Sequence, residues 1–123
     1  MRIFLIDEQE LVLKTLEDFL NASGHEVFTS LSVSEATERN EGVRFAIDVI
    51  IIDAGEVRER IIDAVEKIHL NFPNSDVLLM NHVRLDSQYA LSRDVFAFLR
   101  KPLHLDELDL LLARIMEKRG IES

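Results

Sequence analysis

The sequence predicts a doubly wound α/β domain, in which helices cover both faces of a five-stranded parallel sheet. Short apolar runs alternate with amphipathic stretches along the chain, which is the pattern of repeated strand–helix units. The chain has 123 residues, of which 47% are hydrophobic and 30% charged, as expected for one globular domain. No linker or internal repeat interrupts it. We therefore predict a single domain over residues 1–123.

Five apolar runs predict the strands of this sheet. The first, Arg2–Ile6, is continuous and ends at Asp7, as a strand buried on both faces should. The third, over residues 46–52, gives the strongest signal, because its four consecutive β-branched residues disfavour a helix. The other three runs cover residues 26–30, 77–80 and 95–99.

The amphipathic stretches between these runs predict the helices. Apolar residues recur at helical spacing between positions 12 and 20, and Gly24 stands where a helix commonly ends. Ser32 and Glu35 have the spacing of a capping box, which marks the start of the next helix. The predicted helices after the first extend from there to about residue 40 and over residues 57–70, 85–92 and 106–118.

This order of elements restricts the topology, because strand–helix–strand crossovers in a parallel sheet are right-handed. The buried runs at residues 2–6 and 46–52 suit the centre of a flavodoxin-like (βα)5 sheet with strand order 2-1-3-4-5. Ligand sites in such a sheet lie at the carboxyl ends of strands one and three. The polar residues that follow the predicted strands would therefore meet at one edge: Asp7, Glu8, Asp53, Asn81 and Lys101.

These residue types suit a particular chemistry. Carboxylates gathered in one pocket repel each other, so one of them must take a proton or a cation must join them. An all-oxygen set suits a hard cation such as Mg²⁺, which retains several waters and accepts a phosphate oxygen. Asp53 could then act as a nucleophile that forms an acyl phosphate. Lys101 could balance the charge of the phosphoryl oxygens.

Composition excludes several other classes of protein. There are 14 basic and 23 acidic side chains, and the formal charge of −9 repels nucleic-acid phosphates. No apolar run approaches the ~20 residues that cross a bilayer, and residues 1–7 lack the features of a secretory signal. The absence of cysteine removes disulfides and thiolate chemistry. We therefore expect a cytoplasmic protein that binds neither nucleic acid directly nor a membrane.

Three segments resemble the receiver domain of two-component response regulators. They are the strand with its acidic pair at residues 3–8, the strand that ends in aspartate at 48–53, and the segment Phe-Leu-Arg-Lys-Pro at 98–102. The resemblance extends over essentially the whole chain. It implies a switch that takes a phosphoryl group from a sensor histidine kinase or a phosphotransfer protein. Such a switch catalyses only its own phosphorylation and dephosphorylation, so it is not an enzyme in the ordinary sense.

The resemblance also implies roles for individual residues. Asp53 stands at the phosphoacceptor position, and Lys101 matches the lysine of the family's motif. Asp7 and Glu8 stand at the acidic pair that holds Mg²⁺ together with Asp53. The backbone carbonyl of Gly55 falls where the family supplies a further metal ligand.

Two further positions would carry the switch. Phe98 matches the aromatic residue that changes rotamer on activation, although simple core packing explains it as well. Asn81 stands where the family has Thr or Ser. The Lys101–Pro102 bond is usually cis in the family. The face formed by the fourth helix, fifth strand and last helix would then change its affinity for a partner, and could form a homodimer.

Departures from the family's pattern keep other hypotheses open. Asn81 replaces a hydroxyl residue, Glu8 makes the acidic pair Asp-Glu, and Glu56 and Val57 stand where a Met-Pro step is usual. A phosphorylation-independent receiver-like interaction module is therefore the second hypothesis. A phosphatase of the haloacid-dehalogenase type is disfavoured because Gly55 stands where it needs a second aspartate. A flavin binder is disfavoured because the segment after the first strand is acidic and would repel the phosphate.

Overall fold

The computed structural model describes residues 1–39, 41–53, 61–80 and 94–121. Its strands are β1 (Arg2–Ile6), β2 (Glu26–Ser30), β3 (Val49–Asp53), β4 (Asp76–Met80) and β5 (Ala97–Leu99). Its helices are α1 (Glu10–Ala22), α2 (Val33–Arg39), α4 (Ile61–Asn71) and α6 (Leu105–Arg119), with the 3₁₀ helix η1 (Glu41–Val43) before β3.

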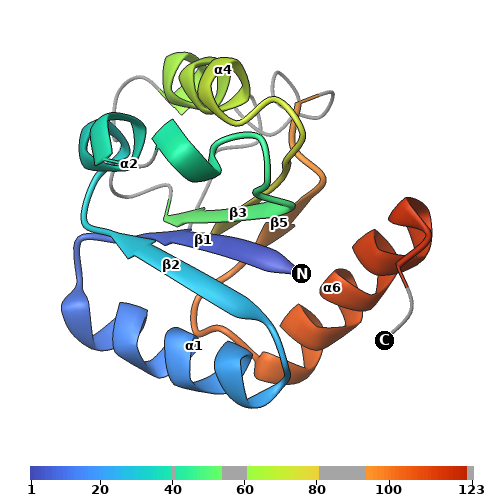
Figure 1. The fold of residues 1–123 in the computed structure, drawn as a ribbon. Helices are drawn as coiled ribbons and strands as arrows, with labels where there is room; N and C mark the ends of the chain where they lie inside the picture. The colour runs from blue at the N-terminus through green and yellow to red at the C-terminus, as the bar shows by residue number, and fades with distance from the viewer. Residues whose placement is uncertain (40, 54–60, 81–93, 122–123) are drawn as a thin grey trace.

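The strands form one parallel sheet in the order β2-β1-β3-β4-β5, which confirms the predicted flavodoxin-like topology. Helices α1 and α6 lie on one face of the sheet, and α2 and α4 lie on the other (Figure 1). Strands β1 and β3 pair with Ile6 opposite Ile52, and β3 and β4 pair with Asp53 opposite Met80. The carboxyl ends of the three central strands are therefore level at one edge of the sheet.

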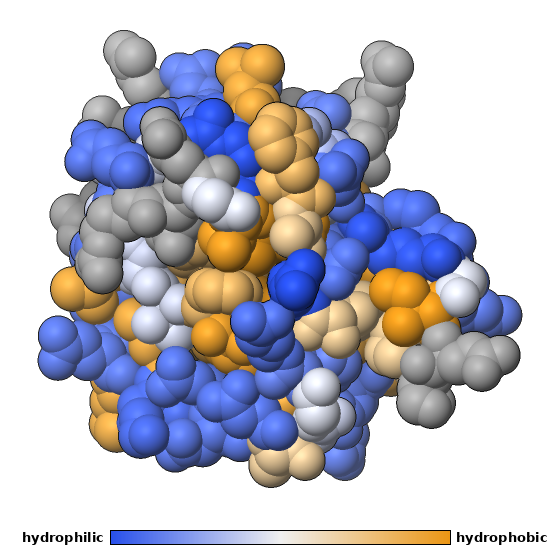
Figure 2. Space-filling view, viewed as in Figure 1, coloured by the Kyte–Doolittle hydropathy of each residue, from blue (hydrophilic) through white to orange (hydrophobic). Residues whose placement is uncertain are grey.

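The core consists of two apolar layers that the sheet separates. Phe4 and Ile6 of β1 face the layer that α2 and α4 cover, whereas Ile3 and Leu5 face the layer that α1 and α6 cover. Hydrophilic residues predominate on the surface where α1 lies, and hydrophobic residues are visible near the centre and at the top of the same view (Figure 2). Because β1 and β3 are covered on both faces, polar residues cannot alternate with apolar ones along them, and residues 3–6 and 49–52 are all apolar.

Several boundaries differ from the predicted ones by a few residues. The strand predicted from residue 46 begins at Val49, because Ala46 lies in the turn after η1 and donates its N–H to the Val43 carbonyl. The last strand begins at Ala97 rather than at residue 95. Helix α4 is described from Ile61, while residues 57–60 of the predicted helix and the whole helix predicted over 85–92 lie outside the described residues.

Local signals in the sequence are confirmed where the structure describes them. Ser32 Oγ accepts the backbone N–H of Glu35 at 3.1 Å, as the capping-box spacing predicts. Gly24 follows α1 with a φ of 91°, a conformation that costs a glycine little. The Lys101–Pro102 peptide bond is cis. None of the helices in the described part of the chain is long and apolar enough to cross a membrane.

Candidate functional site

The predicted site lies at the carboxyl edge of the sheet. Asp7 directly follows β1, Asp53 is the last residue of β3, and Lys101 comes two residues after β5. The pairing of Ile6 with Ile52 brings the two aspartates side by side on adjacent strands. Asp7 is fully buried, and Asp53 is only 4% exposed. Two acidic side chains are therefore buried at a strand end, where water would normally hydrate them.

Lys101 joins the two aspartates. Its Nζ donates a hydrogen bond to Asp53 Oδ2 at 2.7 Å and lies 3.6 Å from Asp7 Oδ2. Strand β4 separates β3 from β5 in the sheet, so the long lysine side chain spans the end of β4 to reach both carboxylates. One ammonium group thus partly balances two negative charges.

The two oxygens of Asp7 have different surroundings. Its Oδ1 accepts the backbone N–H of Gln9 at 2.8 Å, and its own N–H donates to the Ser30 carbonyl at 3.2 Å. Its Oδ2 is buried and accepts no hydrogen bond. Buried polar atoms are nearly always hydrogen-bonded in native proteins, and the cation that faces this oxygen, Lys101 Nζ, lies 3.6 Å away.

The surroundings raise the pKa values of both Asp7 and Lys101. A higher pKa makes the charged form of an aspartate less stable and the charged form of a lysine more stable. Burial raises the pKa of Asp7; the Gln9 N–H opposes it, the negative charge of Asp53 adds to it, and Lys101 opposes it. For Lys101, burial alone would lower the pKa, but the hydrogen bond and charge of Asp53, followed by the charge of Asp7, outweigh burial and raise it. Lys101 therefore stays charged, whereas the ionised form of Asp7 is less favourable than it would be in water.

The carboxylate oxygens of Asp7 and Asp53 suit a hard divalent cation, because such ions take oxygen ligands and offset the repulsion of paired carboxylates. The exposed side chain of Glu8 does not join them: no three acidic or imidazole side chains gather into a metal-holding group within the described ranges. Gly55, the other predicted ligand, lies outside the described residues. Two of the four predicted metal ligands are thus brought together.

Of the two predicted switch residues, Phe98 lies within the described part of the chain and Asn81 does not. Phe98 lies on β5 opposite Leu79 of β4 and is partly buried against the apolar layer on the α4 side of the sheet. This position suits core packing as well as a rotamer switch. Asn81 lies outside the described residues. The switch roles of Phe98 and Asn81 stay predictions.

Sequence reasoning missed how Asp7 is held. The N–H of Gln9, two residues beyond Asp7, fixes one carboxylate oxygen at the start of α1. An aspartate that accepts the N–H of the residue two positions on is a recognised local turn. The spacing of Asp7 ahead of an amphipathic stretch is therefore a signal that could have predicted this bond.

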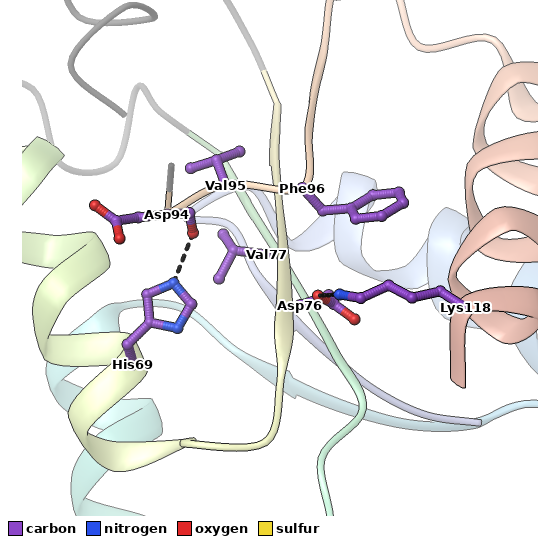
Figure 3. Close-up of a pocket in the computed structure, with 7 residues that line it drawn as sticks. All are labelled: His69, Asp76, Val77, Asp94, Val95, Phe96 and Lys118. Atoms are coloured by element: carbon purple, nitrogen blue, oxygen red, sulfur yellow. Dashed lines mark hydrogen bonds and ion pairs between the residues drawn. The ribbon is translucent and has the colours of Figure 1, made fainter. Parts of the chain in front are cut away.

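A second group of charged residues, also unpredicted, lies at the opposite edge of the sheet. It borders a hollow of about 360 Å³ (Figure 3), lined by His69, Asp76, Val77, Asp94, Val95, Phe96 and Lys118. His69 Nε2 lies 2.6 Å from the Asp94 carbonyl, and Lys118 Nζ donates to Asp76 Oδ1 at 2.6 Å. Asp76 Oδ2 accepts Arg119 Nε at 3.0 Å. Because both carboxylate oxygens of Asp76 already have protein partners, we place the candidate site at the carboxyl edge.

The known proteins that this chain is similar to include a transcriptional regulatory protein and response regulator receiver domains. No protein-family model matches the chain. The transcriptional regulatory protein CrdR of Helicobacter pylori is 26% identical over 124 aligned positions, which cover 98% of this chain and 57% of that protein. The chain thus spans a little more than half the length of this curated relative.

Solved structures share the whole fold. A response regulator receiver domain protein from Clostridium thermocellum is 24% identical with a TM-score of 0.77, over 97% of this chain and 96% of that one. The non-phosphorylated HemR receiver domain from Leptospira biflexa is 22% identical with a TM-score of 0.80, over 94% of this chain and 93% of that one. The chain therefore has the fold of response regulator receiver domains.

Proposed function

We propose that this protein is a two-component signalling receiver that accepts a phosphoryl group on Asp53. The observation that carries the proposal is the contact of Lys101 with Asp53 at 2.7 Å, beside the buried oxygen of Asp7 that accepts no hydrogen bond. A carboxylate nucleophile, a fixed cation and a second carboxylate beside them are the parts that transfer of a phosphoryl group to aspartate needs.

The donor in this proposal is a phosphohistidine of a sensor kinase or a phosphotransfer protein. A carboxylate oxygen of Asp53 forms a bond to phosphorus, while the bond between phosphorus and the donor nitrogen breaks and that nitrogen keeps the electron pair. Lys101 moves from the carboxylate to the phosphoryl oxygens and holds their charge. Hydrolysis by water would later return Asp53 to its free form. The protein is therefore a switch that acts on itself.

Asp7 and Asp53 would hold Mg²⁺ in this proposal, and Glu8 and the backbone carbonyl of Gly55 stay the predicted further ligands. When bound, the ion neutralises charge on the carboxylates and the phosphoryl oxygens. The buried Oδ2 of Asp7 supports this assignment, since a divalent cation would supply the partner that it lacks.

An apolar groove beside the site suits the docking of the donor. It measures about 330 Å³ and is lined by Leu11, Val12, Thr15, Leu16, Leu103 and Leu105. Leu11, which stands four residues after Asp7 in the sequence, is 79% exposed. A large apolar side chain left in water suggests a partner surface, and an amphipathic helix that carries the donor histidine fits such a groove. The face that includes β5 and α6 stays the predicted place for a homodimer.

Intact mass spectrometry tests this function directly. Incubation with Mg²⁺ and acetyl phosphate should add one phosphoryl group to the protein, and omission of Mg²⁺ should prevent the addition. Asp53→Asn should gain nothing, whereas Asp18→Asn, which alters an exposed helical aspartate, should gain the group normally. Equal labelling of Asp53→Asn and the wild type would overturn the assignment of Asp53.

The exposed side chain of Glu8 favours a second candidate function. In that case the domain is a receiver-like interaction module that binds its partner without phosphorylation. NMR titration with Mg²⁺ discriminates the two functions. Shifts confined to the amides near Asp7 and Asp53 support the phosphoacceptor. Absence of both shifts and phosphoryl addition would favour the module.

A further inference from the structure

Strand β2 lies at one side of the sheet and pairs with another strand on only one of its own sides. The sheet order begins at β2, whose neighbour is β1, and β2 lies in front of β1 and above α1 (Figure 1). The other side of β2, which we call its open side, faces away from the sheet. A strand in this position presents backbone N–H and C=O groups to whatever lies beyond it.

Two backbone hydrogen bonds show which residues of β2 face the sheet. The N–H of Glu26 donates to the Met1 carbonyl at 3.0 Å, at the start of the strand. The carbonyl of Ser30 accepts the N–H of Asp7 at 3.2 Å, at the end of the strand. The backbone groups of Glu26 and Ser30 therefore point toward β1.

The residues between them alternate in direction, because successive peptide groups of a pleated strand point to opposite sides. Phe28 then faces β1, and Val27 and Thr29 turn their N–H and C=O groups toward the open side. Among the described residues, none outside β1 bonds to the backbone of Val27 or Thr29. The two residues stand about 6.6 Å apart along the strand, which is the repeat of any strand that could pair with them.

Strand β2 lacks the features by which many proteins prevent further pairing, such as a lysine, a proline or a bulge. Its pairing with β1 is continuous over all five residues, Glu26–Ser30. Its central residues Val27, Phe28 and Thr29 are uncharged and favour an extended strand. The strand at the other side of the sheet, β5, has only three residues. The open side of β2 is therefore the better place for an added strand.

A hollow of about 300 Å³ beside the open side indicates which side chains an added strand should carry. It lies where α1, the end of β2 and the start of α2 meet, and it is lined by Glu10, Leu13, Lys14, Glu17, Thr29, Ser30, Leu31 and Glu35. Three glutamates and one lysine line it, and Lys14 Nζ already donates to Asp18 Oδ1 at 2.9 Å. Negative charge therefore predominates around the hollow.

The glutamates are spaced along the direction of the strand. Glu10 and Glu17 stand seven positions apart on α1, which is about 10.5 Å along the helix axis. More than one residue of an added strand would therefore meet a carboxylate. Leu31, which is 38% exposed, supplies apolar surface between them and the strand. Arginine and lysine suit this combination, because their stems cover apolar surface while their charged ends reach acceptors.

We propose that the open side of β2 binds an extended, basic segment of a partner protein as an additional strand. The backbone of that segment pairs with Val27 and Thr29, and its arginine or lysine side chains enter the hollow. A second copy of this chain is the poorer occupant, because it brings the same glutamates against each other and carries the same formal charge of −9. This binding needs no phosphoryl group on Asp53.

NMR titration of the whole chain with a blocked six-residue peptide of alternating arginine and valine tests the open side. The peptide should shift the amide signals of residues 26–31 and slow hydrogen exchange at Val27 and Thr29. The same peptide with every amide N-methylated keeps its charge but cannot pair as a strand. It should bind roughly tenfold more weakly.

Variants separate the contributions of backbone and charge. Thr29→Pro removes the outward N–H without removing a bond to β1, and should weaken peptide binding roughly fivefold. Thr29→Val keeps that N–H and should change binding less than about twofold. Glu10→Gln combined with Glu17→Gln should weaken binding roughly tenfold. Glu107→Gln combined with Glu117→Gln removes the same charge from exposed positions of α6, and should change binding less than about twofold.

Three results would overturn the proposed strand addition. Equal binding of the two peptides would show that attraction between charges suffices. Unchanged signals over residues 26–31 at millimolar peptide would show that the open side does not bind such a segment. Shifts of Val27 and Thr29 that depend on protein concentration, without peptide, would show that a second copy is the occupant. All three are measured without a phosphodonor, so they are distinguishable from failure of the proposed function.

Discussion

Both edges of this sheet carry aspartates that face cationic side chains, but the two edges differ in how completely the carboxylate oxygens are hydrogen-bonded. At the carboxyl edge, Lys101 faces Asp7 and Asp53, and one oxygen of Asp7 is buried without a hydrogen bond. At the amino edge, every carboxylate oxygen of Asp48 and Asp76 accepts a hydrogen bond from a backbone N–H or a cationic side chain. One edge thus holds an unsatisfied buried acid, and the other holds a satisfied network.

The difference shows how charged clusters of one sheet can serve separate purposes. A fully paired network lowers the energy of the fold and offers little to a ligand. A buried carboxylate oxygen without a hydrogen bond makes the fold less stable, and such groups are found where a ligand binds. We therefore assign stability to the amino edge and chemistry to the carboxyl edge. The predictions below test this assignment, beginning with the largest expected effect.

Mg²⁺ should stabilise the protein through the carboxyl edge alone. At a concentration 100-fold above its dissociation constant, a ligand that binds only the native state adds about 2.7 kcal/mol to the free energy of unfolding. Urea denaturation with and without Mg²⁺ measures this gain. Asp53→Asn should lose most of it, and Asp76→Asn should keep it. A gain that is retained in Asp53→Asn would place the bound cation elsewhere.

Removal of the guanidinium at the amino edge should destabilise the fold. Arg119→Met leaves Asp48 and Asp76 with fewer donors in a partly buried place, and we expect a loss of about 2 kcal/mol in the free energy of unfolding. Chemical denaturation checks this value. Arg114→Met should leave the denaturation midpoint unchanged. Equal midpoints for both variants would refute the view that the amino edge is a stabilising network.

Neutralisation of Asp7 should increase the free energy of unfolding rather than lower it. Its raised pKa means that the native state favours the protonated form, so ionised Asp7 lowers stability as pH rises through its native pKa. Asp7→Asn should therefore stabilise the metal-free protein at neutral pH by about 1 kcal/mol, the lower end of the cost of a buried polar atom without a hydrogen bond.

The pH dependence sharpens this prediction. Below the ordinary value of 3.8, Asp7 is protonated in both the native and the unfolded protein, so the advantage of Asp7→Asn should disappear. Thermal denaturation across the acid range follows the difference between variant and wild type. An advantage that grows toward low pH would contradict the stated cause.

The smallest effect is expected where an ion pair belongs to neither edge. Lys14 and Asp18 pair on the outer surface of α1 at 2.9 Å, with side chains 67% and 61% exposed. Water and salt screen such a pair, and its loss is close to neutral. Lys14→Met should leave the denaturation midpoint unchanged. A large loss would mean that the stability at the amino edge reflects charge in general rather than its bonded network.

The sheet and the centre of the site followed from the sequence because each depends on local pattern. A continuous apolar run predicts a strand buried on both faces, and parallel pairing sets the ends of β1 and β3 level. Residues directly after those runs, Asp7 and Asp53, must then be neighbours. The boundary at Val49 was missed because Ala46 is apolar yet lies in a turn, and hydrophobic patterning does not distinguish the two.

The sequence by itself therefore determined the parallel sheet, its strand order, and the meeting of Asp7, Asp53 and Lys101. Tertiary structure alone decided which carboxylate oxygens find partners, because those partners come from distant segments: 48 positions separate Lys101 from Asp53, and 71 separate Arg119 from Asp48. It also decided that Glu8, next to Asp7 in sequence, stays exposed. Hydrogen bonds depend on position within a few tenths of an ångström, and only the packing of helices on the sheet fixes positions that closely.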